Sequence, residues 1–291
     1  MLRRFFLAWL GCAALLCACS PADPPAARAE APAAARRIIT LSPHLTELAF
    51  AAGAGDRVVG AVAFSDYPPA ARQVPRVGDA FRVDYEAVAA LDPDLILGWT
   101  SGNPPETLAR LRELGFRVVA LEPTDLADIG RQLATIGALA GTQAVADAAA
   151  GAFQARLDAL ASRASHAARI RVFLQLSARP YYTVTDRHFL GQGLRLCAGD
   201  NVFGALPGLT AIVEAESVLD AAPEAIIASD IGGRDALAGW RAWPGLPAVR
   251  AGNLFLVDAD LLSRPGPRLL DGIEVMCARL GEARTRLPPR E

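Results

Sequence analysis

Residues 142–168 carry the longest helical pattern in the chain, with a strand and helix series on each side of it. Almost all of them are good helix formers, and Thr142 follows Gly141 as the expected N-cap. Apolar residues three or four apart predict one buried stripe, formed by Val145, Ala149, Phe153, Leu157 and Leu160. At 1.5 Å per residue, about 26 residues would span roughly 39 Å, more than one small α/β lobe requires. We therefore expect a stiff connector between two similar lobes; the alternative is a sheet-covering helix of one large domain.

Strand and helix patterns alternate on both sides of this connector. Before it, the sequence predicts strands at 37–41, 58–62, 95–98 and 117–121, and helices at 44–52, 84–90, 105–114 and 126–140. After it, strands are predicted at 172–176, 181–184, 226–228 and 254–257, and helices at 189–197, 215–219 and 268–280. This rhythm predicts an α/β fold of two Rossmann-like lobes, 37–140 and 169–291, with mainly parallel sheets and the bridging helix 141–168.

Two segments of the chain are similar to each other. DYEAVAALDPDLILGW at 84–99 and EAESVLDAAPEAIIAS at 214–229 align without gaps, and Glu86 meets Glu216. Each copy reads as a capped helical turn, a proline and a buried strand. The match indicates a structural repeat between the two lobes.

The first residues have the pattern of an export signal. Two arginines precede an apolar run, and Leu16-Cys17-Ala18-Cys19 resembles a bacterial lipobox with Cys19 as the lipid acceptor. We expect a lipoprotein-type signal peptide at 1–19, a Pro- and Ala-rich linker at 20–36, and a protein anchored by lipid in the periplasm. The alternative is ordinary signal cleavage near residues 27–29, which would release a soluble protein.

Composition narrows the remaining possibilities. The 291 residues carry a formal net charge of −2 and are 52% hydrophobic, which supports one large or two small cores and makes nucleic acid an unexpected partner. Outside the leader only Cys197 and Cys277 remain. In an exported protein two cysteines point to one disulfide, and the alternative is a pair of free buried thiols.

Aromatic residues lie at the predicted strand ends, where ligands of parallel α/β lobes bind. They are Phe64, Phe81, Trp99, Tyr181 and Tyr182. Together they favour a large, flat, apolar ligand held between the lobes. No catalytic motif is found in the mature part, so we expect a binding protein and not an enzyme. The best acid/base pair for the alternative, an exported enzyme, is His44 with Asp66.

Several segments resemble the cobalamin-binding proteins of bacterial ABC importers, a branch of the metal-chelate solute-binding class. They are RIITLSPHLTELAFAAG at 37–53, FSDYPPAA at 64–71, LDPDLILGW at 91–99, RVFLQLS at 171–177 and LRLCAGDNVF at 194–203. The resemblance implies a class III periplasmic binding protein fold, in which one long helix joins two lobes.

The resemblance also implies roles for individual residues. Phe64, Tyr182 and the loop Asp260-Leu261-Leu262-Ser263-Arg264 match ligand contacts, Cys197 and Cys277 match a disulfide, and Glu86 and Glu216 match acids that dock onto the permease. Some positions depart from the family pattern. Ala80 and Thr210 stand in place of tryptophans, Leu261-Leu262 replaces an aromatic pair, and His44 replaces a small residue.

These observations predict a monomeric receptor that captures cobalamin or a related corrinoid. It would deliver this ligand to an inner-membrane ABC permease dimer with its ATPase, and it would use no catalytic cofactor. The alternative ligand within the class is haem or a ferric siderophore. His44 is a candidate ligand to the bound metal, and its alternative role is a solvent-facing or helix-capping imidazole.

Overall fold

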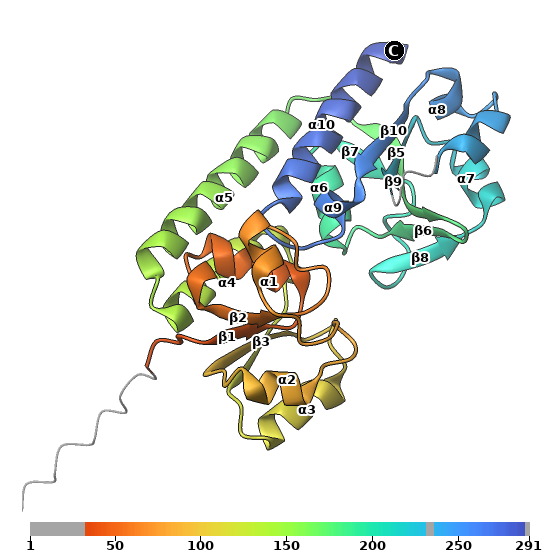
Figure 1. The fold of residues 1–291 in the computed structure, drawn as a ribbon. Coiled ribbons are helices and arrows are strands. Elements are labelled where there is room, and N and C mark those ends of the chain that lie inside the picture. Colours follow the sequence, from red (N-terminus) through yellow and green to blue (C-terminus); the bar gives the residue numbers. More distant parts are fainter. Residues whose placement is uncertain (1–32, 231–235, 289–291) are drawn as a thin grey trace, which may run out of the picture. The chain divides into compact units, whose positions relative to one another are not determined.

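The computed structural model describes residues 33–230 and 236–288, and residue 230 through its backbone only. Residues Ala34–Glu291 form one compact unit, in which two α/β lobes are joined by the long helix α5 (Gln143–Ala164) (Figure 1). The predicted leader 1–19 with Cys19, and the linker up to residue 32, lie outside the described residues. No helix in the described ranges combines the length and apolar character of a membrane span.

The N-terminal lobe is built on a four-stranded parallel sheet in the order β2-β1-β3-β4. The strands are β1 (Ile38–Thr40), β2 (Val58–Ala61), β3 (Leu95–Trp99) and β4 (Val118–Leu121). Helices α1 (Pro43–Ala51) and α4 (Leu126–Ala140) cover one face, and α2 (Tyr85–Ala90) and α3 (Pro105–Glu113) cover the other. Ile38 packs into the first layer and its neighbour Ile39 into the second, because successive strand residues point to opposite faces.

The C-terminal lobe has a mixed sheet in the order β10-β9-β5-β6-β8, with β7 also paired to β5. Its strands are β5 (Ile170–Ala178), β6 (Tyr181–Val184), β7 (Gly199–Asn201), β8 (Thr210–Val213), β9 (Ala225–Asp230) and β10 (Leu254–Asp258). Strands β5, β7, β9 and β10 pair in parallel, whereas β6 pairs antiparallel with both of its neighbours, β5 and β8. Strands β7 and β8 are additions to the predicted set.

The described part of this lobe contains the α-helices α6 (Phe189–Arg195), α7 (Ala215–Ala221), α8 (Pro247–Arg250), α9 (Ala259–Leu262) and α10 (Leu269–Arg286). Helices α6 and α10 pack on the sheet face that carries Val172 and Leu174. The other face, which carries Phe173, packs against α7, α8 and the buried Trp240. Both lobes therefore have sheets covered on two sides.

Helix α5 lies against α4 and α10 and contributes to a core shared by both lobes. Its buried stripe is Ala146, Phe153, Leu157 and Leu160. The prediction that Val145 begins this stripe is wrong, because Val145 is 54% exposed. Ala146 lies seven residues before Phe153 and so on the same face, at nearly two full turns.

The predicted side-chain cap of α5 is also wrong. The Thr142 hydroxyl donates to the Ala52 carbonyl, at 2.7 Å, and makes no cap hydrogen bond. Thr142 instead ties the start of the bridging helix to the end of α1. The connector thus begins fixed to the N-terminal lobe by a side chain as well as by the chain itself.

The structure confirms the internal repeat. Helix α2 leads into β3 as α7 leads into β9, and residues 92 and 222, at equivalent places, both adopt positive φ, 44° and 42°. The Arg37 amide donates to Asp94 at 3.0 Å, and the Arg171 amide donates to Glu224 at 2.8 Å. One predicted feature fails: Asp84 caps α2 with its side chain, but Glu214 makes no such bond to α7.

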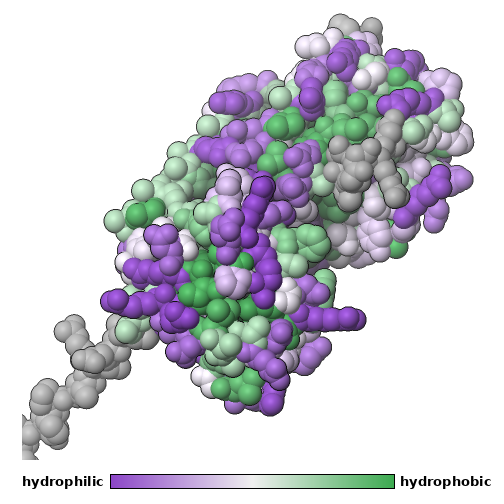
Figure 2. Space-filling view, viewed as in Figure 1, coloured by the Kyte–Doolittle hydropathy of each residue, from purple (hydrophilic) through white to green (hydrophobic). Residues whose placement is uncertain are grey.

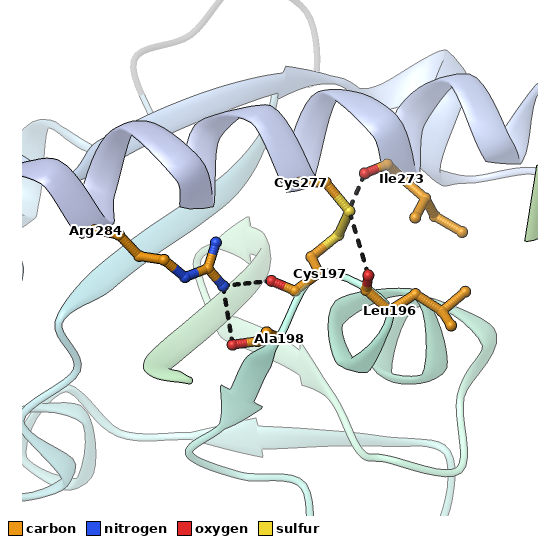
Figure 3. Close-up of a disulfide and its surroundings, with 6 residues drawn as sticks. All are labelled: Leu196, Cys197, Ala198, Ile273, Cys277 and Arg284. Carbon is orange, nitrogen blue, oxygen red and sulfur yellow. Dashed lines mark hydrogen bonds between the residues drawn. A yellow bond between two sulfur atoms is a disulfide. The ribbon is translucent and has the colours of Figure 1, made fainter. Parts of the chain in front are cut away.

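A disulfide joins Cys197, just after α6, to Cys277 on α10 (Figure 3). Arg284, about two turns further along α10 on the same side, donates to the carbonyls of Cys197 and Ala198 at 2.5 and 3.1 Å. The final helix is therefore attached to the rest of the C-terminal lobe by a covalent bond and by a charged side chain. The disulfide predicted from the cysteine count is confirmed.

Hydrophobic surface on the face shown in Figure 2 lies in separate areas on the two lobes, each bordered by hydrophilic side chains. Most of the large apolar side chains are buried, and the exposed ones include Phe64, Phe81, Tyr182 and Ile212. Several of these exposed residues are the ones that the sequence marks as candidate ligand contacts.

Candidate functional site

Two adjacent cavities, of about 670 and 310 Å³, are lined by residues of both lobes. They share Trp99, Ser263 and Pro265 in their linings, so they form two parts of one cleft. The N-terminal lobe delivers its lining residues from the carboxyl ends of its strands: His44 follows β1, Phe64 follows β2, Trp99 ends β3 and Glu122 follows β4. This edge of a parallel sheet is where α/β proteins bind ligands.

Trp99 lines both cavities. Its backbone amide donates to Asn103 Oδ1 at 2.7 Å, and its indole lies so close to Gly102 that any Cβ there would overlap the ring. The indole Nε1 is buried without a hydrogen-bond partner among the described residues. The strand end and the absence of a side chain at residue 102 hold the ring in place, and the protein encloses this donor.

His44 is buried beside Trp99, with 2% of its surface exposed. Its Nδ1 lies 2.5 Å from the Ser42 hydroxyl, and burial, aided by the charge of Arg264, lowers its pKa to about 3. His44 is therefore neutral at physiological pH. The expectation of a solvent-facing or helix-capping imidazole is wrong, because the segment after α9 covers this residue.

His44 Nε2 is buried and has no partner within the described ranges. The role of His44 as a metal ligand therefore stays a prediction.

Arg264 carries the main positive charge of the smaller cavity. Its Nη1 donates to Asp66 at 2.7 Å and to Glu47 at 3.2 Å, and its Nη2 lies 3.5 Å from Asp260. Partial burial acts to raise the pKa of Asp66, but the hydrogen bond and charge of Arg264 outweigh it and leave that pKa below its usual value. The pair is thus ionised at neutral pH.

The structure brings together six of the residues predicted to form the site. They all line the smaller cavity: His44, Phe64, Trp99, Asp260, Ser263 and Arg264. Phe64 is 76% exposed and adopts a positive φ of 64°, which turns its ring outward at the cleft.

Four predicted contacts line neither part of the cleft: Phe81, Tyr182, Leu261 and Leu262. Leu262 is buried in the core of the C-terminal lobe, so the prediction that it contacts a ligand is wrong for this structure. Phe81 and Tyr182 are 72% and 39% exposed and remain predictions.

The larger cavity contains residues that the sequence analysis did not identify as site residues. They come from the loops after β4 and β6 and from α6, and include Glu122, Thr124, Asp186, His188, Phe189 and Arg195. Glu122 and Thr124 follow β4, so their place at a strand end is the sequence signal for them. Their polar side chains carry no aromatic signal.

His188 illustrates how this second part of the cleft is built. Its Nδ1 accepts the Leu190 amide at 3.1 Å, which caps α6, and its ring lies 3.9 Å from the Phe189 ring. Burial lowers its pKa to about 4. In this neutral tautomer the proton is on Nε2, so the ring presents a donor to the cleft and no lone pair.

Groups of three or more His, Cys, Asp or Glu side chains arranged to hold a metal are not found in the part of the chain that the structure describes. The cleft combines aromatic walls with single polar groups, as small-molecule binding sites do. Its geometry suits recognition of a ligand, with Trp99 and Phe64 as apolar surfaces and Arg264 and Asp260 as polar contacts.

Comparisons with known proteins agree with this architecture. A family model described as periplasmic binding protein matches residues 38–261. A vitamin B12-binding protein of Vibrio cholerae serotype O1 is 37% identical over 253 residues, which cover 86% of this chain and 90% of that protein.

Solved structures show the same similarity. The periplasmic vitamin B12-binding protein BtuF of Vibrio cholerae matches with a TM-score of 0.78 and 37% identity, over 86% of this chain and 98% of that one. A periplasmic haem-binding protein of Pseudomonas aeruginosa matches with a TM-score of 0.74 and 26% identity, over 84% and 92% of the two chains. The cleft-bearing, two-lobed chain described above belongs to the periplasmic binding protein family.

Proposed function

We propose that this protein captures cobalamin or a related corrinoid in the cleft between its lobes. The observation that carries the proposal is the 37% identity to the vitamin B12-binding protein of Vibrio cholerae over most of both chains. The cleft supports it, because the exposed Phe64 and the half-buried Trp99 offer apolar surface to a large flat ring. The protein acts by binding and release, in keeping with relatives that are binding proteins.

Haem is the second candidate, since a haem-binding relative shares the fold. Haem iron is commonly held by a protein side chain such as histidine. The described histidines offer little for this role: His44 Nε2 is buried, the His188 proton sits on Nε2, and His166 is exposed and lines neither part of the cleft. These features favour a corrinoid.

Titration calorimetry of the purified protein with cyanocobalamin and with haemin tests the proposal. We expect saturable binding of cyanocobalamin at one site and much weaker binding of haemin. Tight haemin binding without cyanocobalamin binding would replace the corrinoid by haem, and binding of neither would refute the proposal.

We further propose that the protein works in the periplasm as the monomeric receptor of an ABC importer, with an inner-membrane permease dimer and its ATPase as partners. The family supports the compartment and the partner. Glu86 and Glu216 are the proposed docking residues. Both are exposed in the first turns of α2 and α7, and neither makes an ion pair within the described ranges. Lipid attachment at Cys19 is the proposed anchor and rests on the Leu16–Cys19 motif alone.

A further inference from the structure

A buried ionic cluster joins the two lobes beside the smaller cavity. Glu47, on α1 of the N-terminal lobe, is 3% exposed and accepts two hydrogen bonds from Arg268, from Nη2 at 2.6 Å and from Nε at 3.0 Å. The same carboxylate accepts from Arg264 Nη1 at 3.2 Å. Both arginines belong to the segment between α9 and α10 of the C-terminal lobe. Glu47 therefore holds that segment against α1.

Glu47 does not line the smaller cavity, whereas Arg264 does. The guanidinium of Arg264 donates from Nη1 to both Glu47 and Asp66, and Asp260 lies near Nη2. Its Nε has no hydrogen-bond partner within residues 33–230 and 236–288. Arg264 is thus a rigid donor whose orientation depends on residues that a ligand does not touch.

The carboxylates of this cluster neutralise the positive charge of Arg264. The carboxylates of Glu47, Asp66 and Asp260 surround the guanidinium groups of Arg264 and Arg268, so the five formal charges sum to −1. Arg268 also lies over the Tyr67 ring at 3.8 Å, which fixes it further. An incoming carboxylate would meet a donor whose charge is already neutralised, together with a net negative field.

We propose that Glu47 is a positioning residue that makes Arg264 a selective donor to uncharged carbonyl groups, so that the cleft favours ligands with carboxamide side chains over ligands with carboxylate side chains. This inference rests on the proposed function, because a corrinoid carries carboxamides around its ring whereas haem carries carboxylates. The choice between carboxamide and carboxylate ligands then depends on Glu47, a residue that lies outside the lining of the smaller cavity.

The test compares cyanocobalamin with its monocarboxylic acids, obtained by hydrolysing one side-chain amide and separating the isomers. For at least one isomer we expect a dissociation constant about tenfold above that of cyanocobalamin, on the order of the effect of one like charge near a protein surface. The selectivity ratio is the dissociation constant of that monocarboxylic acid divided by that of cyanocobalamin. In Glu47→Gln this ratio should fall about fivefold, because the variant removes one negative charge and keeps the shape of the side chain.

Two further variants keep the test decisive. Asp66→Asn removes a second carboxylate of the cluster from a half-exposed position, so it should fold even if Glu47→Gln does not, and it should lower the same ratio. Glu106→Gln removes an equal charge from an exposed residue that lines neither part of the cleft, and it should leave the ratio unchanged.

The outcomes separate the inference from the proposed function. Equal affinity of the wild-type protein for cyanocobalamin and every isomer overturns the inference while the corrinoid function stands. An unchanged ratio in Asp66→Asn and in folded Glu47→Gln overturns the role of the cluster. Failure to bind either form refutes the proposed function, and the inference falls with it.

Discussion

The imidazole of His44 stands edge-on to the indole of Trp99, with ring centroids 4.9 Å apart and ring planes at 85°. Aromatic pairs favour this arrangement. His44 lies in the first turn of α1, which follows β1, and Trp99 ends β3, so the contact joins the ends of two neighbouring strands. A buried, neutral histidine thus serves as a support for the aromatic surface that faces the cleft.

Removing the exposed aromatic surface of the cleft should weaken ligand binding. Phe64→Ala eliminates stacking and apolar area worth on the order of 1 to 3 kcal/mol, so affinity for cyanocobalamin should fall about five- to a hundredfold in calorimetry. Tyr182→Ala tests in the same way an exposed ring of the C-terminal lobe that lines neither cavity and stays a predicted contact. Unchanged affinity in both variants would contradict the proposed pocket, and Phe81→Ala tests the third exposed ring separately.

Acid should destabilise the protein partly through His44. An imidazole whose pKa is about 3 in the folded chain and 6.5 in the unfolded chain takes up a proton on unfolding, so the free energy of unfolding falls as the pH drops below 6.5. At pH 5 the loss from this residue is about 2 kcal/mol. Between pH 7 and pH 5, His44→Gln should lose that much less stability than wild type in urea denaturation.

His188 should act in the same direction, because burial also lowers its pKa, to about 4. The comparison of wild type with His44→Gln isolates the effect of His44, since other groups titrate in both proteins. Identical pH dependence in the two would show that His44 is not buried in neutral form. The visible spectrum of a bound corrinoid should be the same in both proteins. A shift in His44→Gln would support ligation of the bound metal by His44.

Reversing both charges at the proposed docking surface should abolish uptake. Glu86→Arg with Glu216→Arg should leave folding and cyanocobalamin affinity intact, because both side chains are exposed and unpaired within the described ranges. Charge pairs at such surfaces govern association rate and orientation. Complex formation with the permease and vitamin uptake in cells are the measurements.

A matched control reverses two exposed carboxylates elsewhere, Glu106→Arg with Asp147→Arg, and changes the net charge equally. Loss of uptake in both double variants would indicate a non-specific charge effect. Normal uptake in Glu86→Arg with Glu216→Arg would show that docking uses other residues.

The disulfide should contribute strongly to stability. Its cysteines are 80 residues apart, and closing a loop of this length is worth about 4 kcal/mol in the chain-entropy model. Cys197→Ser with Cys277→Ser should lower the free energy of unfolding by an amount of this order in urea denaturation. Reductant should lower the wild-type value towards that of the variant, and no response to reductant would show that the bond does not form in solution.

Lipid attachment at Cys19 predicts membrane association of the mature protein. Cys19→Ser should move the protein from the membrane fraction to the soluble periplasmic fraction, because the acceptor thiol is lost. Mass spectrometry of the N-terminus provides the direct measurement. A wild-type protein that is already soluble, with an unmodified N-terminus near residue 30, would establish ordinary signal cleavage instead.

Much of the fold could be predicted because its signals are local. The helix predicted at 126–140 is α4, Leu126–Ala140, and the structure shows why its ends are sharp: Asp125 caps its start and Gly141, at positive φ, ends it. Strand β8 was missed because Thr210–Val213 is a short run at the sheet edge that pairs only with β6. Such a strand carries little pattern of its own and depends on its partner.

The sequence by itself determined the alternation of strands and helices, the bridging helix, the repeat that relates Glu86 to Glu216, and the aromatic residues at strand ends. Each follows from patterns within short segments, the repeat being the similarity of two such segments. Only the tertiary structure decided that Glu47 binds Arg268, 221 residues away, and that His44 is buried and neutral beneath the same segment. Burial and charge pairing depend on which distant segments pack together, and the periodicity of neither segment contains that information.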